Sequence, residues 1–317
     1  MAHHGWPLDR PDRLSIVFQS IGSIPQPRQK AATRNRAQKR DAARSPKVAS
    51  LNKRGGYLMA LNRCCSIIML TCGLVTATSG AAGAAVTDWV GDSHAAVRLI
   101  TATDSVAADS TLDAGLEFRF SKGRHGYWRT PGDAGVAPAI DWSGSEYITR
   151  HDIAWPAPHR LVIEDLQNSI YVKHVVLPVK LSLEKTGAPA RIRISLAYAT
   201  CSEVCVPYQA DLAFQLPLGA GRTSPEAIAI NAARKTVPRT AAAAGIDIIG
   251  TRVAGPASEP ALVVDLLSKD RPFVQPDLFI EGIGNGIPAA PKVELRANDQ
   301  AVRLTVRISQ VPRPIAF

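Results

Sequence analysis

The chain has 317 residues, enough for two ordinary domains, and a formal net charge of +10. The positive charge is confined to the start: residues 1–58 hold twelve Lys and Arg against three Asp, whereas residues 86–317 hold 24 basic and 24 acidic side chains. A neutral main region lacks the basic surface that sequence-independent binding of a phosphate backbone requires, so nucleic acid is excluded as a partner.

Residues 1–58 form a basic leader rich in Arg, Lys, Ala, Pro and Gln, with sparse and irregular apolar positions. This composition predicts a disordered segment rather than a folded domain. The simplest account is an upstream start assignment, with Met59 as the true initiator. The alternative is a genuine basic N-terminal tail.

Residues 59–85 have the three parts of a secretory signal peptide: a short start with Arg63, a mostly apolar stretch from Cys64 to about Ala77, and small residues up to Ala85. We expect cleavage near Ala85 and a periplasmic protein. An uncleaved anchor is the alternative, although the apolar stretch is shorter than the roughly 20 residues of a spanning helix. A lipoprotein site at Cys72 is disfavoured because Thr71 is larger than the residue normally found before a lipidated cysteine.

Residues 86–217 alternate apolar and polar positions in short runs separated by Gly- and Pro-rich turns, which predicts an antiparallel β-sandwich. The clearest run places Ile192, Ile194, Leu196 and Tyr198 on one face. The longer apolar run Val172–Leu183 contains Pro178 and is expected to be a bulged or edge strand. The other predicted strands are Val97–Thr103, Thr111–Phe120 and Gln209–Leu216.

Residues 218–245 are expected to be a short helical linker. Ser224 is the predicted N-cap and Pro225 the first helical residue of an Ala-rich helix that ends near Lys235. Pro238 interrupts the helix, and Gly245 is expected to stop a second short turn.

Residues 246–317 predict a second, smaller β domain, to which we assign a structural or docking role because it contains no cysteine and no histidine. The chain stops without a polar tail, which leads us to expect either a truncated chain or an end close to a further segment. Its predicted strands are Ile246–Val253, Ala261–Leu267, Phe273–Ile280, Val293–Leu295 and Val302–Ile308.

Two cysteines, Cys201 and Cys205, lie outside the leader and signal segment; the other three are Cys64, Cys65 and Cys72. In an exported chain, two cysteines four positions apart are expected to bond to each other. A close pair between two strand-like runs supplies what thiol–disulfide exchange needs: an attacking thiol, a resolving thiol and access for a partner. A passive stabilising disulfide is the open alternative, although closing a loop of about five residues contributes only about 2 kcal/mol.

Other chemistry has less support in the residues. Tetrahedral zinc needs four ligands, and there is no second cysteine pair and no paired histidines nearby. Thiolates suit Cu(I), but every methionine lies in the leader or signal segment. No hydrolase nucleophile motif is present. We therefore expect no cofactor and no resident metal. The histidines that lie outside the leader and the signal segment are scattered along the chain, at His94, His125, His151, His159 and His174.

The region 86–217 resembles the N-terminal periplasmic domain of the DsbD family of protein-disulfide reductases, and within it the ScsB-like branch linked to copper tolerance. The most specific block is Tyr198-x-x-Cys201-x₃-Cys205-x-Pro207, and the likeness extends through the second β domain. The other motifs that carry the resemblance are His125-Gly-Tyr-Trp-Arg129, Ile170-Tyr-Val172 and Val176-Leu-Pro-Val179.

The resemblance implies an immunoglobulin-like sandwich whose dithiol receives electrons from a membrane-embedded domain. It implies that the dithiol passes them to thioredoxin-like periplasmic proteins, including disulfide isomerases and cytochrome c maturation factors. By position, Cys205 would bond to the partner and Cys201 would resolve. The family also has an acidic cap loop near the dithiol, for which Glu164-Asp165-Leu166 is the nearest candidate; an ordinary solvated loop is the alternative.

One departure from the family concerns domains. Its full-length members have a multi-helix membrane domain and a thioredoxin-like domain, and no segment after residue 90 could span a bilayer. We therefore expect a component of a protein-disulfide reductase, either part of a longer protein or supplied with electrons by a separate membrane partner. The alternative function is a non-catalytic β-sandwich binding module with a structural disulfide.

Overall fold

The computed structural model describes residues 85–107, 111–164, 166–184, 188–282 and 286–310. The predicted leader and all but the last residue of the predicted signal peptide lie outside these ranges. The described residues belong to one compact unit of the chain.

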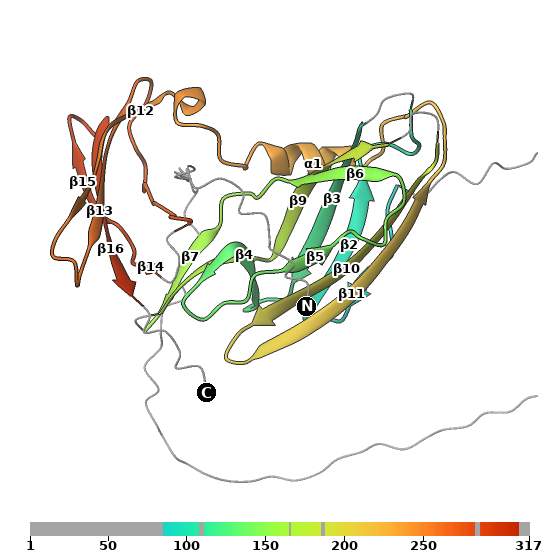
Figure 1. Cartoon of the computed structure of the whole chain (residues 1–317), viewed down its shortest axis with the longest axis horizontal. Coiled ribbons are helices and arrows are strands. Elements are labelled where there is room, and N and C mark those ends of the chain that lie inside the picture. The colour runs from blue at the N-terminus through green and yellow to red at the C-terminus, as the bar shows by residue number, and fades with distance from the viewer. Residues whose placement is uncertain (1–84, 108–110, 165, 185–187, 283–285, 311–317) are drawn as a thin grey trace, which may run out of the picture. The chain divides into compact units, whose positions relative to one another are not determined.

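Two antiparallel sheets form the first region, so the prediction of a mainly β, immunoglobulin-like sandwich is confirmed (Figure 1). The first sheet has the order β1-β2-β3-β9-β6. Its strands are β1 (Val90–Gly91), β2 (Ala95–Thr101), β3 (Thr111–Phe120), β9 (His174–Leu183) and β6 (Ile148–Ile153).

The second sheet has the order β11-β10-β4-β8-β7, and the short strand β5 pairs with β10. Its strands are β11 (Cys205–Leu216), β10 (Ala190–Cys201), β4 (His125–Gly132), β8 (Leu166–Val172), β7 (His159–Ile163) and β5 (Ala139–Asp141).

The sandwich core forms because alternate residues of each strand point between the sheets. In β10, the predicted inward residues Ile192, Ile194, Leu196 and Tyr198 are all at most 5% exposed. They join one apolar cluster with residues such as Leu116 of β3. The period-two pattern was therefore sufficient to orient this strand.

The run Val172–Leu183 is not one strand, and its main part is not at an edge. β8 ends at Val172, Lys173 has a left-handed φ of 61°, and β9 starts at His174, so the chain bends there and passes from the second sheet to the first. β9 lies between β3 and β6. Pro178 is tolerated because the β6 ladder stops at the pair Ile153–Val179. The change of sheet was missed because an apolar run does not reveal a one-residue bend.

A single α-helix, α1 (Ala227–Arg234), is found in the described residues, and it packs on the outer face of the first sheet through Ile230. Gly115 of β3 makes room, since a Cβ there would lie 3.3 Å from the Ile230 side chain. The prediction of Ser224 as N-cap was wrong: its hydroxyl donates to the carbonyl of Thr101, 2.5 Å away, and Glu226 is the cap residue. With eight residues, α1 is far too short to cross a bilayer.

A 3₁₀ turn, η1 (Ala242–Ala244), leads to Gly245, whose φ of 71° ends it as predicted. The second β region follows and is a further antiparallel sheet. In it, β13 lies between β12 and β16, and both β14 and β15 pair with β16. Its strands are β12 (Ile246–Ala254), β13 (Ala261–Ser268), β14 (Gly286–Pro288), β15 (Lys292–Arg296) and β16 (Ala301–Gln310).

The predicted strand Phe273–Ile280 is instead an irregular segment after β13. Its apolar residues are buried for another reason: Phe273, Leu278 and Ile280 cover one face of the β12–β16 sheet. A short apolar run next to turn residues has the same sequence signature whether it is buried as a strand or as a loop, which explains the error.

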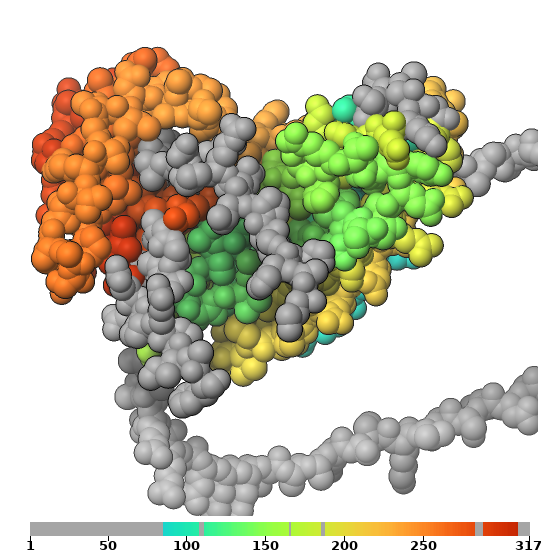
Figure 2. Space-filling view, viewed as in Figure 1, coloured from blue at the N-terminus to red at the C-terminus, as the bar shows by residue number. Residues whose placement is uncertain are grey.

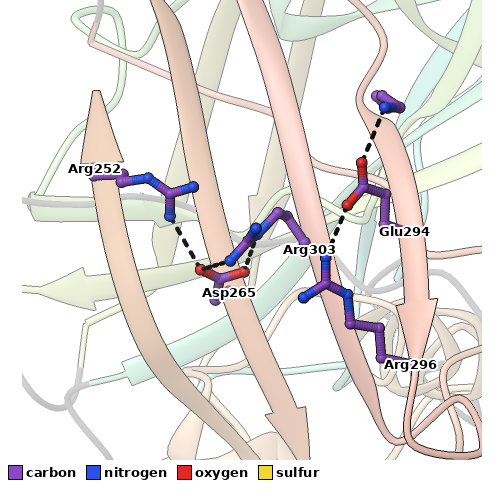
Figure 3. Close-up of polar contacts among 6 residues, drawn as sticks. Arg252, Asp265, Glu294, Arg296 and Arg303 are labelled. Carbon is purple, nitrogen blue, oxygen red and sulfur yellow. Dashed lines mark hydrogen bonds and ion pairs between the residues drawn. The ribbon is translucent and has the colours of Figure 1, made fainter. Parts of the chain in front are cut away.

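The opposite face of this sheet carries a ladder of ion pairs (Figure 3). Asp265 of β13 accepts two hydrogen bonds from Arg303 of β16, at 2.6 and 3.0 Å, and a longer one from Arg252. Glu294 of β15 pairs with Arg296. Because all of these side chains are at least one-fifth exposed, we assign them a solvated face rather than a large share of stability.

Candidate functional site: the cysteine hairpin

The two cysteines form the last rung of a long hairpin. β10 and β11 stay in register from Ala190–Leu216 to Cys201–Cys205, and only Ser202, Glu203 and Val204 lie between the cysteines. The Cα atoms of Cys201 and Cys205 are 4.0 Å apart and the sulfurs are bonded. Since directly opposed residues share a face of a sheet, the register itself holds the pair together.

The two sulfurs differ in access. The Cys201 residue is 2% exposed, whereas Cys205 is exposed. Figure 1 shows the turn between β10 and β11 projecting from one end of the sandwich, and no coloured segment covers it in Figure 2. Val204, in that turn, is 68% exposed. Of the two cysteines, Cys205 is therefore the one that a partner protein can contact from solvent.

Cys201 packs against apolar residues of neighbouring strands. It is the register partner of His125 in β4, which is in turn the register partner of Val172 in β8. Tyr127 and Ile170, two rungs further along β4 and β8, form a buried cluster with Cys201. The buried sulfur thus has a fixed, dry environment on one side and the exchangeable sulfur on the other.

Tyr127 is the polar side chain that reaches the exposed sulfur: its hydroxyl lies 3.8 Å from Sγ of Cys205. Burial raises the pKa of Tyr127, so the phenol keeps its proton at neutral pH and can donate. Its ring meets that of His125 edge to face, with centroids 5.3 Å apart.

His125 is 7% exposed, and burial lowers the pKa of its imidazole, so the ring is neutral at pH 7. The hydroxyl of Thr200 donates to the His125 carbonyl at 3.0 Å, which fastens β4 to β10 beside the last rung. The dithiol therefore has a neutral tyrosine and a neutral imidazole as its polar neighbours on β4.

The loop after β4 limits the movement of Tyr127. A Cβ on Gly135 would lie 2.5 Å from the Tyr127 ring, so the loop backbone lies directly on the ring. Sequence reasoning noted His125–Arg129 only as a family motif. Their spacing of two puts Tyr127 and His125 on one face of a strand, but only the pairing of β4 with β10 brings that face to the cysteines.

The predicted cap residues lie elsewhere on the same sheet. Glu164, with a left-handed φ of 55°, and Leu166 form the tip of the β7–β8 hairpin, and Asp165 lies outside the described residues. Leu166 is six residues along β8 from Val172, the residue on the Cys201 row. At about 3.3 Å per residue this is roughly 20 Å, so the register does not bring the tip to the dithiol. The cap assignment stays a prediction.

A segment of the second β region is fastened to β4 close to this site. Arg129, two residues after Tyr127, makes a two-pronged ion pair with Glu281, with both distances 2.7 Å. Phe279 is 3% exposed and packs edge to face on Trp128. We call Asp277–Glu281 the strap, because its other end is bound in the same way.

The other end of the strap is Asp277, whose carboxylate accepts hydrogen bonds from two guanidinium nitrogens of Arg160 in β7. The Arg160 guanidinium also lies over the Phe279 ring, 4.5 Å from its centroid. The strap thus joins the second β region to two strands of the sheet that carries the dithiol.

In the part of the chain that the structure describes, no group of three or more His, Cys, Asp and Glu side chains is placed to hold a metal ion.

The fold and site together define a class: a β-sandwich with a disulfide across the exposed end of a hairpin. Residues 96–217 match the family described as "Thiol:disulfide interchange protein DsbD, N-terminal". These residues therefore form a DsbD-type N-terminal domain, as predicted, and the chain contains a thiol–disulfide exchange domain.

Two solved structures are similar. The N-terminal periplasmic domain of ScsB from Proteus mirabilis is 23% identical, with a TM-score of 0.57, over 71% of this chain and 85% of that one. The reduced N-terminal domain of DsbD from Neisseria meningitidis is 16% identical, with a TM-score of 0.24, over 38% of this chain and 83% of that one. The first likeness shows a shared fold across both β regions. No curated protein matches the chain.

Proposed function

We propose that the chain is a periplasmic dithiol carrier that takes electrons from a membrane disulfide-reductase module and passes them to thioredoxin-like proteins. The observation that carries this proposal is the unequal access of the two sulfurs: Cys205 exposed, Cys201 buried at the same rung. A passive staple does not need one accessible sulfur, whereas exchange does. We propose export through the signal segment that begins near Met59, and domain limits at 86–217, 218–245 and 246–317.

Two exchange steps account for the relay. In the first, a donor thiolate attacks Sγ of Cys205, the Cys205–Cys201 bond breaks, and the Cys201 thiolate leaves and takes up a proton. A second donor thiol then displaces Cys205, so the donor becomes a disulfide and the carrier a dithiol. In the second step, the Cys205 thiolate attacks an acceptor disulfide, and Cys201 resolves the mixed disulfide and releases a reduced acceptor. Each transfer moves two electrons.

The geometry supports this division of labour. Cys201 needs to reach only Cys205, and the register holds the two together. Cys205 needs to reach another protein, and it lies beside the exposed turn residue Val204. The protonated Tyr127 hydroxyl is placed to donate to Cys205 when that sulfur carries negative charge. The biological setting we propose is copper tolerance or cytochrome c maturation.

A mixed-disulfide trap tests the proposal. The Cys201→Ser variant is incubated with a thioredoxin-fold disulfide isomerase whose resolving cysteine is replaced by serine and whose remaining cysteine is activated as a mixed disulfide with thionitrobenzoate. Cys205 should displace thionitrobenzoate and a covalent complex should accumulate on non-reducing gels, because neither protein then has a thiol that resolves it. The Cys205→Ser variant should give at most a trace, and the double serine variant none. Equal trapping by both single variants would refute the roles assigned here.

A redox titration of the wild-type chain separates exchange from a structural disulfide. In glutathione or dithiol buffers, we expect the Cys201–Cys205 bond to be reduced at a potential above about −300 mV, the range below which structural disulfides lie. A bond that stays oxidised well below that value would favour the alternative, a binding module with a structural disulfide.

A further inference from the structure

A cavity of about 630 Å³ lies between three segments that are far apart in the sequence. One wall is the β8–β9 bend with His159 of β7. A second is the chain that follows α1, and the third is the start of the irregular segment after β13. Its volume falls in the usual range for small-molecule sites.

The cavity collects positive charge. Lys235 and Arg239 line it from the chain after α1, and Arg271 lines it from the segment after β13. All three residues are exposed, and no ion pair joins any of them to a carboxylate of the described residues. No Asp or Glu is among the lining residues. Cations of one sign around a concave surface concentrate the field within it.

Two acids beside the walls are bonded to other residues: Glu117 bonds to Arg98 and to the lining residue His174, and Asp277 bonds to Arg160. A third acid, Asp270, precedes Arg271 and has its carboxylate against Gly245, where a Cβ would lie 2.6 Å from it; it borders the cavity but is not among the lining residues. The lining cations are therefore not neutralised from behind by Glu117 or Asp277.

The rest of the lining is mostly apolar. A ligand would thus meet apolar side chains together with guanidinium and ammonium groups, a combination suited to a compact organic body with charged substituents. The apolar lining residues include Pro156, Ala157, Val175, Val237, Pro238 and Phe273.

We propose that this cavity binds a small polyanion, a molecule with two or more carboxylate or phosphate groups. The two arginines suit such groups because a guanidinium can donate two parallel hydrogen bonds to one carboxylate or phosphate. Three cations from two separate segments converge on one hollow, so a single anion can bridge them. The proposal is independent of the dithiol chemistry, although Val172 lines the cavity and also packs in the Cys201 cluster.

Isothermal titration calorimetry at low salt tests the proposal, with the full chain and two probes, citrate for carboxylates and inorganic pyrophosphate for phosphates. At least one probe should bind with one-to-one stoichiometry. The charge reversals Arg239→Glu and Arg271→Glu should each weaken binding about tenfold or more. The matched control is Arg307→Glu, an exposed arginine of β16 outside the cavity, which should change affinity less than about twofold.

The outcomes separate clearly. Binding of only one probe supports the site and identifies its anion class. Absence of binding by both probes at millimolar concentration overturns the proposal, as does equal weakening by Arg307→Glu, which would indicate attraction by net charge alone. If a charge reversal lowers the thermal unfolding temperature, the neutral variants Arg239→Gln and Arg271→Gln replace it, and unchanged affinity in both would equally overturn the proposal.

Discussion

Reduction of the Cys201–Cys205 bond should leave the fold almost intact. The bond closes a loop of only five residues, for which the loss of chain entropy in the unfolded state corresponds to about 2 kcal/mol. Eleven further rungs of the same hairpin, from Thr200–Val206 to Ala190–Leu216, hold β10 and β11 together without it. We therefore expect the free energy of unfolding to fall by no more than about 2 kcal/mol on reduction.

Urea unfolding of the oxidised and the dithiol-reduced chain, followed by tryptophan fluorescence, measures this difference. The Cys201→Ala/Cys205→Ala variant serves as control and should unfold identically in both buffers. By the thermodynamic cycle, 2 kcal/mol corresponds to about 45 mV between the potentials of the folded and the unfolded pair. A loss above about 4 kcal/mol, or a reduced chain that does not fold, would show that the bond is a structural staple and would refute the reasoning.

Three further outcomes follow from the contacts described above. Tyr127→Phe removes the hydroxyl next to Cys205. Because one hydrogen bond contributes about 1 kcal/mol, the reduced variant should react with iodoacetamide about fivefold more slowly than the reduced wild type at neutral pH. An unchanged rate would show that the hydroxyl does not stabilise the Cys205 thiolate. Burial alone would raise the pKa of Glu117, but the bonds from Arg98 and His174 outweigh it and lower that pKa. The stability they supply is thus present above about pH 4.5 and is lost as the pH falls through the lower folded value. Thermal unfolding of Glu117→Gln should accordingly depend less on pH between about 5 and 3 than that of the wild type, and parallel curves would contradict this. Phe279→Ala should lower the free energy of unfolding in urea by about 3–5 kcal/mol, because it leaves a cavity against Trp128. The control is Val274→Ala: Val274 is 56% exposed, so the change should be less than about 0.5 kcal/mol. Similar losses in the two variants would show that the strap does not stabilise the chain.

The features that were predicted correctly depend on residues close together in the sequence. The alternation in β10 oriented Ile192 to Tyr198, and the short spacing of Cys201 and Cys205 predicted their bond. Gly245 was identified as a stop because few other residues adopt a positive φ readily.

Features that depend on distant partners were not predictable in the same way. Ser224 has the sequence of an N-cap, but Thr101, more than a hundred residues away, offers its hydroxyl a buried carbonyl. Phe273–Ile280 has the apolar content of a strand, yet it is buried as a loop against a sheet and, through Phe279, against Trp128. The placement of Tyr127 at Cys205 likewise required the pairing of β4 with β10.

The position of the dithiol at the terminal rung has a consequence for how such a carrier can change. Ser202, Glu203 and Val204 are exposed and connect only the two cysteines. Substitutions or a change of length in this turn alter how the sulfurs are held and what a partner meets first, while the core between the sheets is untouched. Redox potential and partner choice can therefore vary among related chains without any adjustment of the interior, and grafting the turn of one carrier onto the hairpin of another should transfer both properties together.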